Sequence, residues 1–160
     1  MSATTDSEST APHSGPAAVL SILALALLPW TVVVENGTTF VMAWGLVTPA
    51  PFHAFSIVEY FGQPGVRYGS LPPSLRAWPL ASGVYALALA SAGVGFATGR
   101  EDRRVTAGLL VLAGVASLSV TVGFLRRGVP LAVPLGTGAL WLTAWWFYRS
   151  ALRRALPASG

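Results

Sequence analysis

Four stretches of the chain contain no Asp, Glu, Lys or Arg, and each is long enough for a helix that crosses a bilayer. These uncharged windows are residues 11–34, 78–99, 105–125 and 128–148. A helix rises about 1.5 Å per residue, so about 20 residues reach across ~30 Å of hydrocarbon. Only 10% of the residues are charged, against about 25% in soluble domains. The pattern predicts an integral membrane protein in the cell membrane.

The windows lead to a prediction of fold class: an all-α membrane protein with four transmembrane helices. A small extracellular insertion, made of a hairpin and an interfacial helix, is expected between helices 1 and 2. Because residues 1–16 are acidic and rich in Ser, Thr and Pro, we expect a disordered tail there. The predicted spans are about 17–34, 78–97, 105–125 and 129–148 within one membrane domain, 17–150, with an extracellular segment at 35–77 and a basic cytoplasmic tail at 151–160.

Helices two and three are joined by the short sequence GREDRR, which is typical of antiparallel neighbours. We therefore expect a helical hairpin. Small residues recur at four-residue spacing on both helices, and such stripes let helix backbones approach closely in lipid. The stripes are Ser91, Gly95 and Gly99 on one helix and Ala113, Ser117 and Thr121 on the other.

The segment between the first two spans is too interrupted to be read in one way. Asn36-Gly37 lies between β-branched runs, which favours a hairpin, although helix one could also run through Val34. Residues 52–61 have aromatic side chains at three-residue spacing, as in a helix lying in the interface. A fifth span or a re-entrant segment at 38–61 is the alternative, and Asn36 is also a glycosylation sequon.

No catalytic constellation is visible in the sequence. His53 and Glu59 form the one candidate acid/base pair, but a separation of six residues would place them on different faces of a helix. There is no cysteine and no glycine-rich phosphate loop. The arginines adjoin apolar runs, where membrane topology explains them better than nucleic acid does. We predict no enzymatic activity, no catalytic, cofactor-binding or metal site, and no nucleic-acid partner.

The distribution of arginines predicts the orientation. With four spans, the amino terminus, the 100–104 loop and the carboxyl tail share one side with six arginines, and the other side has four. Positive residues favour the cytoplasm, so both termini are expected there. The pair Arg126-Arg127 opposes this assignment.

Several segments together resemble a family of small haloarchaeal membrane proteins encoded in some genomes near archaeosortase, an intramembrane enzyme that processes surface proteins. The similar segments are LLPWTVVV (27–34), FVMAWGLV (40–47), EYF (59–61), EDRRVTAGLLVLAG (101–114) and PLGTGALWLTAWWFY (134–148). Met42-Ala43 departs from the pattern before WGLV. The resemblance implies membrane location and no established activity.

These observations lead to two functional hypotheses. The first is a non-enzymatic accessory or scaffold protein for cell-surface protein processing or another membrane complex. The second is an oligomeric small-solute transporter or channel component. The expected partners are the lipid bilayer and other membrane proteins, and a homo-oligomer is allowed.

Overall fold

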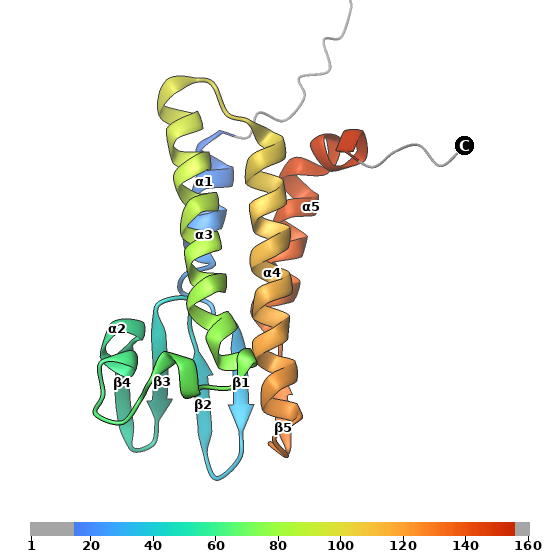
Figure 1. Cartoon of the computed structure of the whole chain (residues 1–160). Helices are drawn as coiled ribbons and strands as arrows, with labels where there is room; N and C mark the ends of the chain where they lie inside the picture. The colour runs from blue at the N-terminus through green and yellow to red at the C-terminus, as the bar shows by residue number, and fades with distance from the viewer. Residues whose placement is uncertain (1–14, 156–160) are drawn as a thin grey trace, which may run out of the picture.

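The computed structural model describes residues 15–155 and combines a layer of helices with a five-stranded antiparallel sheet at one end of that layer (Figure 1). The predicted all-α class is therefore wrong. The elements follow the chain in the order α1 (Pro16–Ala24), β1 (Thr31–Val34), β2 (Thr38–Val41), β3 (Gly45–Pro49), β4 (Phe52–Ser56), α2 (Ile57–Phe61), the 3-10 helix η1 (Tyr68–Ser70), α3 (Pro73–Thr98), α4 (Arg103–Leu125), β5 (Leu131–Val133) and α5 (Leu135–Ala155).

The two longest helices, α3 and α4, form the antiparallel hairpin that the sequence predicts. Gly99 ends α3 in the left-handed conformation, with φ 67°, which glycine adopts at little steric cost. Asp102 then caps α4, because its carboxylate accepts hydrogen bonds from the backbone N–H groups of Arg104 and Val105. Within the described residues, α3 and α4 are the two helices long and apolar enough to cross a membrane. The prediction of four spans is thus corrected to two candidate spans.

The first predicted span, residues 17–34, divides into a helix and a strand. α1 ends at Ala24, and Pro29 prevents the helix from resuming because proline lacks a backbone donor. Three consecutive valines follow in β1, where β-branched side chains are favoured. β1 pairs with β2 across the Asn36-Gly37 turn, so the predicted hairpin is confirmed and a helix through Val34 is excluded.

The fourth predicted span, residues 129–148, is also interrupted. Pro130 and Pro134 flank the short strand β5, which pairs antiparallel with β1. α5 begins only at Leu135 and continues to Ala155, so it includes the first part of the predicted basic tail. Proline is compatible with an edge strand and with the position before a helix, whereas in a helix interior it removes a backbone hydrogen bond.

The predicted interfacial helix at 52–61 is half wrong. Its first half is the edge strand β4, reached through a turn that contains the cis Ala50–Pro51 bond, and only its second half is the short helix α2. Neither half forms the alternative fifth span. The predicted acidic tail, apart from residues 15–16, and residues 156–160 lie outside the part of the chain that the structure describes.

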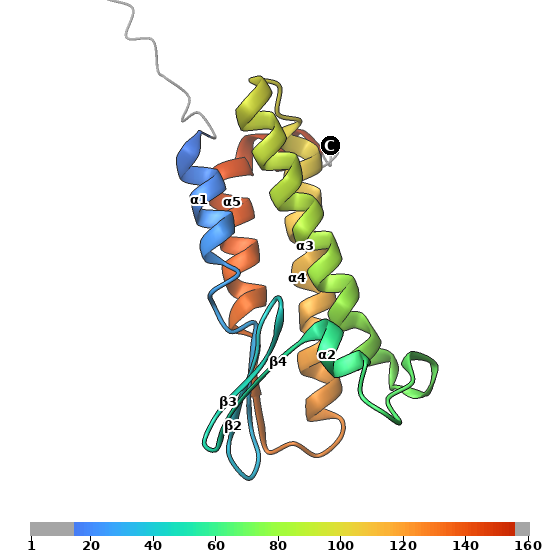
Figure 2. The ribbon, with the colours of Figure 1, turned by 90° about the vertical axis from the view of Figure 1, so that its left-hand side faces the viewer.

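The sheet has the order β4-β3-β2-β1-β5 and lies beside the lower ends of α3 and α4 (Figures 1 and 2). Alternation along β1 directs Val33 toward the helices. There it joins Val41, Trp78, Val120 and Val129 in a buried apolar cluster. This cluster fastens the sheet to the helical layer.

The interior of the helical layer is built from small side chains. The predicted stripe on α4 is confirmed, since Ala113, Ser117 and Thr121 are all buried. On α3 the prediction holds for Gly95 but not for Gly99, which is exposed in the cap. The packing face of α3 consists of Ala81, Tyr85, Ala88, Ala92 and Gly95.

Candidate functional site

Charged side chains gather at the two ends of the helical layer, and the stretch between them has none. Residues 77–99 and 105–125, which cover most of α3 and α4, contain no Asp, Glu, Lys or Arg. This charge-free layer presents large apolar side chains on its outer surface. They include Leu80, Leu87 and Val94 on α3, Leu112 and Val115 on α4, and Leu142, Trp145 and Trp146 on α5.

The end of the layer at the α3–α4 loop is closed by a polar cluster. The buried Tyr148 hydroxyl donates a 2.7 Å hydrogen bond to the Glu101 carboxylate. The Arg103 guanidinium donates to the Phe147 carbonyl and lies 5.9 Å from the centroid of the Tyr148 ring. These contacts connect the α3–α4 loop and the start of α4 to α5. Charged residues of GREDRR therefore stabilise the packing of the helices.

The opposite end of the layer is joined to the sheet by buried hydrogen bonds. The Thr31 and Thr121 hydroxyls are 2.7 Å apart, and both residues are almost fully buried. The Trp78 indole N–H donates to the Met42 carbonyl, and that of Trp30 donates to the Leu25 carbonyl. Since these bonds connect α4, α3 and the segment after α1 to the strands, the position of the sheet is fixed relative to the helices.

The second face of the sheet lies away from α3 and α4, as the edge-on view in Figure 2 shows. One apolar row crosses all five strands on this face, because the pairing aligns Val133, Val32, Phe40, Val47 and Ala54. None of the five side chains is fully buried. We call this row the open face of the sheet. A sheet that is apolar on both faces normally has both faces covered.

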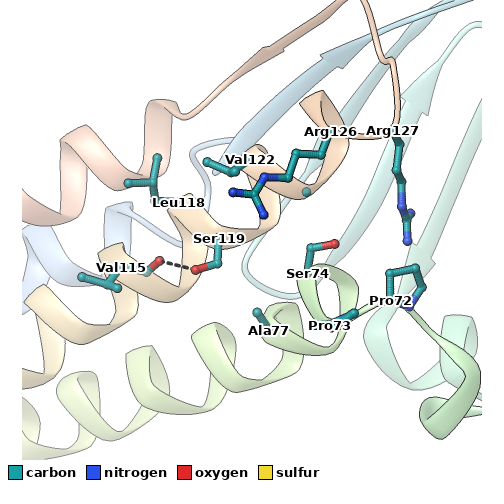
Figure 3. Close-up of a pocket in the computed structure, with 11 residues that line it drawn as sticks. Pro72, Pro73, Ser74, Ala77, Val115, Leu118, Ser119, Val122, Arg126 and Arg127 are labelled. Atoms are coloured by element: carbon teal, nitrogen blue, oxygen red, sulfur yellow. Dashed lines mark hydrogen bonds between the residues drawn. The ribbon is translucent and has the colours of Figure 1, made fainter.

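A groove of about 700 Å³ lies between the start of α3 and the end of α4 (Figure 3). We call it the α3–α4 groove. Its walls are mostly apolar, and Arg126 and Arg127 reach into it from the end of α4. The Ser119 hydroxyl donates a 3.0 Å hydrogen bond to the Val115 carbonyl of its own helix. The groove thus combines an apolar length with two cations at one end.

A smaller cavity of about 280 Å³ lies between the sheet and the helices. Val41, Trp78 and Phe124 line it, and Glu35 and Arg127 are its charged residues. The cavity adjoins the α3–α4 groove through Arg127, which lines both.

The structure does not join His53 and Glu59 into an acid/base pair. His53 lies exposed on β4, where its Nδ1 is 3.2 Å from the Pro51 carbonyl. Glu59 closes a capping box at the start of α2: its carboxylate accepts from the Ser56 N–H, and its own N–H donates to the Ser56 hydroxyl. The hydrogen bonds from Ser56 lower the pKa of Glu59. Each candidate therefore has a local structural role.

The structure also places the predicted glycosylation sequon. Asn36 lies exposed in the turn between β1 and β2, so the sequon is accessible. Within residues 15–155, no three side chains of His, Asp or Glu gather into a group that could hold a metal ion.

Sequence reasoning missed the α3–α4 groove and the open face of the sheet. The spacing of Val115, Ser119, Val122 and Arg126 places them on one helix face, and this pattern could have indicated the α3–α4 groove. The open face of the sheet depends on strand pairing, which the sequence does not show.

Comparison with known proteins agrees with the expectation of an uncharacterised family. No curated protein and no solved structure matches the chain. The family described as Domain of unknown function (DUF8050) matches residues 1–158. The chain therefore belongs to the DUF8050 family.

Proposed function

We propose that this chain is an integral membrane protein whose α3–α4 hairpin crosses the bilayer, with α1 and α5 packed beside it. The single observation that carries the proposal is the charge-free layer with apolar side chains on its outside. A core helix of a soluble protein would also be apolar, but it would be mostly buried. Only 28% of the apolar stretch of α3 and 39% of that of α4 are buried. Their remaining apolar surface needs a nonaqueous environment.

The dimensions of the layer support this placement. Residues 79–98 of α3 extend about 30 Å at 1.5 Å per residue, which is the thickness of the hydrocarbon core. The sheet lies at one end of the layer, and the segments next to its strand ends reach the level of the first turns of this stretch, where Trp30 packs against Tyr85. That position suits a sheet with open edges, because unpaired strand edges are not tolerated in hydrocarbon.

The charges at the two ends suggest the orientation. The end that contains the α3–α4 loop and the end of α5 holds six of the ten arginines, and the sheet end holds four. Under the positive-inside rule the loop end lies in the cytoplasm and the sheet stands outside the membrane.

We further propose a non-enzymatic accessory role, in which the open face of the sheet contacts a partner. The row of apolar side chains from Val133 to Ala54 supplies a contact surface outside the charge-free layer. The resemblance to haloarchaeal proteins encoded near archaeosortase suggests the processing of cell-surface proteins as the setting. A membrane partner would cover the apolar face and so remove it from water.

Fractionation and labelling test the membrane placement. The protein should remain with membranes after alkaline extraction and leave them only in detergent. In a chain that has no native cysteine, Ser70→Cys at the sheet end should react with a membrane-impermeant maleimide on intact cells, while Thr98→Cys should react only after lysis. Recovery of folded protein in the aqueous fraction would contradict the placement, and labelling of Thr98→Cys on intact cells would reverse the orientation.

Crosslinking tests the accessory role. A photoreactive residue at Phe40, on the open face, should give one discrete protein adduct in native membranes. The same residue at Leu112, on the lipid-facing side of α4, is the matched control and should give no protein adduct. The proposal fails if Phe40 gives no adduct in membranes where the protein is correctly inserted. Movement of solute by the purified protein in liposomes would favour a transporter instead.

A further inference from the structure

We propose that the α3–α4 groove binds one bilayer phospholipid with an anionic phosphate headgroup. This inference rests on the membrane placement proposed above and adds a specific ligand to it.

The groove crosses the sheet-side border of the proposed hydrocarbon layer. Val115, Ser119, Val122 and Arg126 follow one another at intervals of four, three and four residues, so they share one face along about 16 Å of α4 and its end. Val120 clusters with Trp78, which directly precedes the stretch 79–98, so Val115 lies inside the hydrocarbon and Arg126 lies beyond it. An acyl chain that packs against Val115 would therefore bring its headgroup to the level of Arg126.

The cations are free to bind a phosphate. Arg126 and Arg127 are exposed, and neither side chain makes a hydrogen bond or ion pair with any other residue in the stretch 15–155. Glu35 lines the neighbouring cavity together with Arg127, and the two side chains form no ion pair. In Figure 3 the Arg127 side chain extends toward Pro72 at the start of α3, and the Arg126 guanidinium lies in the space between Val122 and Ser74. Guanidinium groups bind phosphate through paired, charge-assisted hydrogen bonds.

The remaining polar groups of the groove are compatible with this occupant. Ser119 donates to its own helix, so it presents no unsatisfied donor to an acyl chain. Ser74, in the first turn of α3, places a hydroxyl at the same end as the arginines, where it can donate to a headgroup oxygen. Polar groups thus lie at one end and apolar groups along the rest, as in a phospholipid.

The test is native mass spectrometry of the detergent-purified full chain with phosphatidylglycerol, phosphatidylcholine or glycerol phosphate added. The wild-type protein should retain one phosphatidylglycerol with about tenfold preference over phosphatidylcholine, since each arginine near a headgroup favours an anionic lipid. The double variant R126Q/R127Q should lose this preference. The control variant R67Q/R104Q removes two other exposed arginines, neither of which lines the groove, and should keep it.

A second variant keeps the charges and blocks the apolar length. Ser119→Phe should lower phosphatidylglycerol retention although both arginines remain, and it decides the matter if R126Q/R127Q does not fold. Equal retention of both lipids by the wild-type protein, or unchanged retention by both groove variants, would overturn the inference. Full competition by glycerol phosphate would also overturn it, because the site would then be one for a free anion. If the protein fractionates with membranes and yet shows no selectivity, only this inference fails; if it is recovered without detergent, the membrane placement fails.

Discussion

The contact between Gly123 and Ser74 gives the sharpest test of how α3 and α4 pack. A Cβ added at Gly123 would lie inside the van der Waals radii of the Ser74 Cβ and Oγ, but at an ordinary 3.4 Å from the Ser74 Cα. Gly123→Ala should therefore force the helix ends apart and destabilise the protein by about 1–3 kcal/mol. In a chain of this length each kcal/mol corresponds to about 2–4 °C in Tm. Thermal unfolding in detergent, followed by circular dichroism, measures the effect.

A rescue and a matched control make this prediction specific. Ser74→Gly removes both clashing atoms, so the double variant S74G/G123A should regain most of the stability lost in G123A, after the cost of about 1 kcal/mol or less for a glycine in the helix. Gly108→Ala lies on the same helix, and its Cβ would meet nothing within 4 Å, so it should be neutral or slightly stabilising. An unchanged Tm in G123A, or a loss that S74G does not relieve, would refute the packing.

Three further predictions concern the junction and the sheet. Trp30→Ala should cost about 3–5 kcal/mol in thermal unfolding, because the side chain is 2% exposed and its indole N–H is bonded. Thr31→Val should cost about 1–3 kcal/mol by leaving the Thr121 hydroxyl without its sheet partner, whereas the double variant with Thr121→Val should cost less than the sum of the single variants. Ser56→Ala should speed hydrogen exchange in α2. The hydrogen bonds with Ser56 lower the pKa of Glu59 in the folded protein. The stabilisation that they give is therefore present above the unfolded pKa of Glu59 and is lost as the pH falls through its folded pKa. Hydrogen exchange in α2 should accordingly depend less on acid pH in Ser56→Ala than in the wild-type protein.

The hairpin of α3 and α4 could be predicted because local signals agreed. The uncharged windows gave its length, and GREDRR gave the turn. Gly99 and Asp102 supply the cap chemistry that ends one helix and begins the next. The buried stripe on α4 followed from the spacing of Ala113, Ser117 and Thr121, a periodicity that survives folding unchanged.

The sheet could be predicted only where one turn defines it. Asn36-Gly37 predicted the pairing of β1 with β2, which are adjacent in sequence. The pairing of β1 with β5 brings Val33 and Ala132 together over about a hundred residues, and no local pattern encodes such a partner. The open face of the sheet depends on this long-range register, so it was not visible in the sequence.

The candidate site was predicted poorly for a chemical reason. His53 and Glu59 stood out because titratable side chains are rare in this chain, yet the structure uses Glu59 to cap a helix. The α3–α4 groove was overlooked because serine and valine on a helix carry no catalytic signal. Its character comes from the combination with Arg126, and an arginine beside an apolar run indicates membrane topology before it indicates a binding site.

The two predicted spans at 17–34 and 129–148 were wrong for the same reason, because each contains a strand. β1 is apolar at every position after Thr31: Val33 clusters with Trp78, Val32 belongs to the open face, and Val34 alternates to the same side as Val32. A strand that is apolar on both faces has the same lack of charge as a membrane helix, so absence of charge cannot separate the two. Proline does separate them, since Pro29, Pro130 and Pro134 each stand where a helix stops or a strand is flanked. In this chain an uncharged window gives the distance between charges; Pro29, Pro130 and Pro134 mark where helix gives way to other structure, whereas Pro79 is accommodated inside α3.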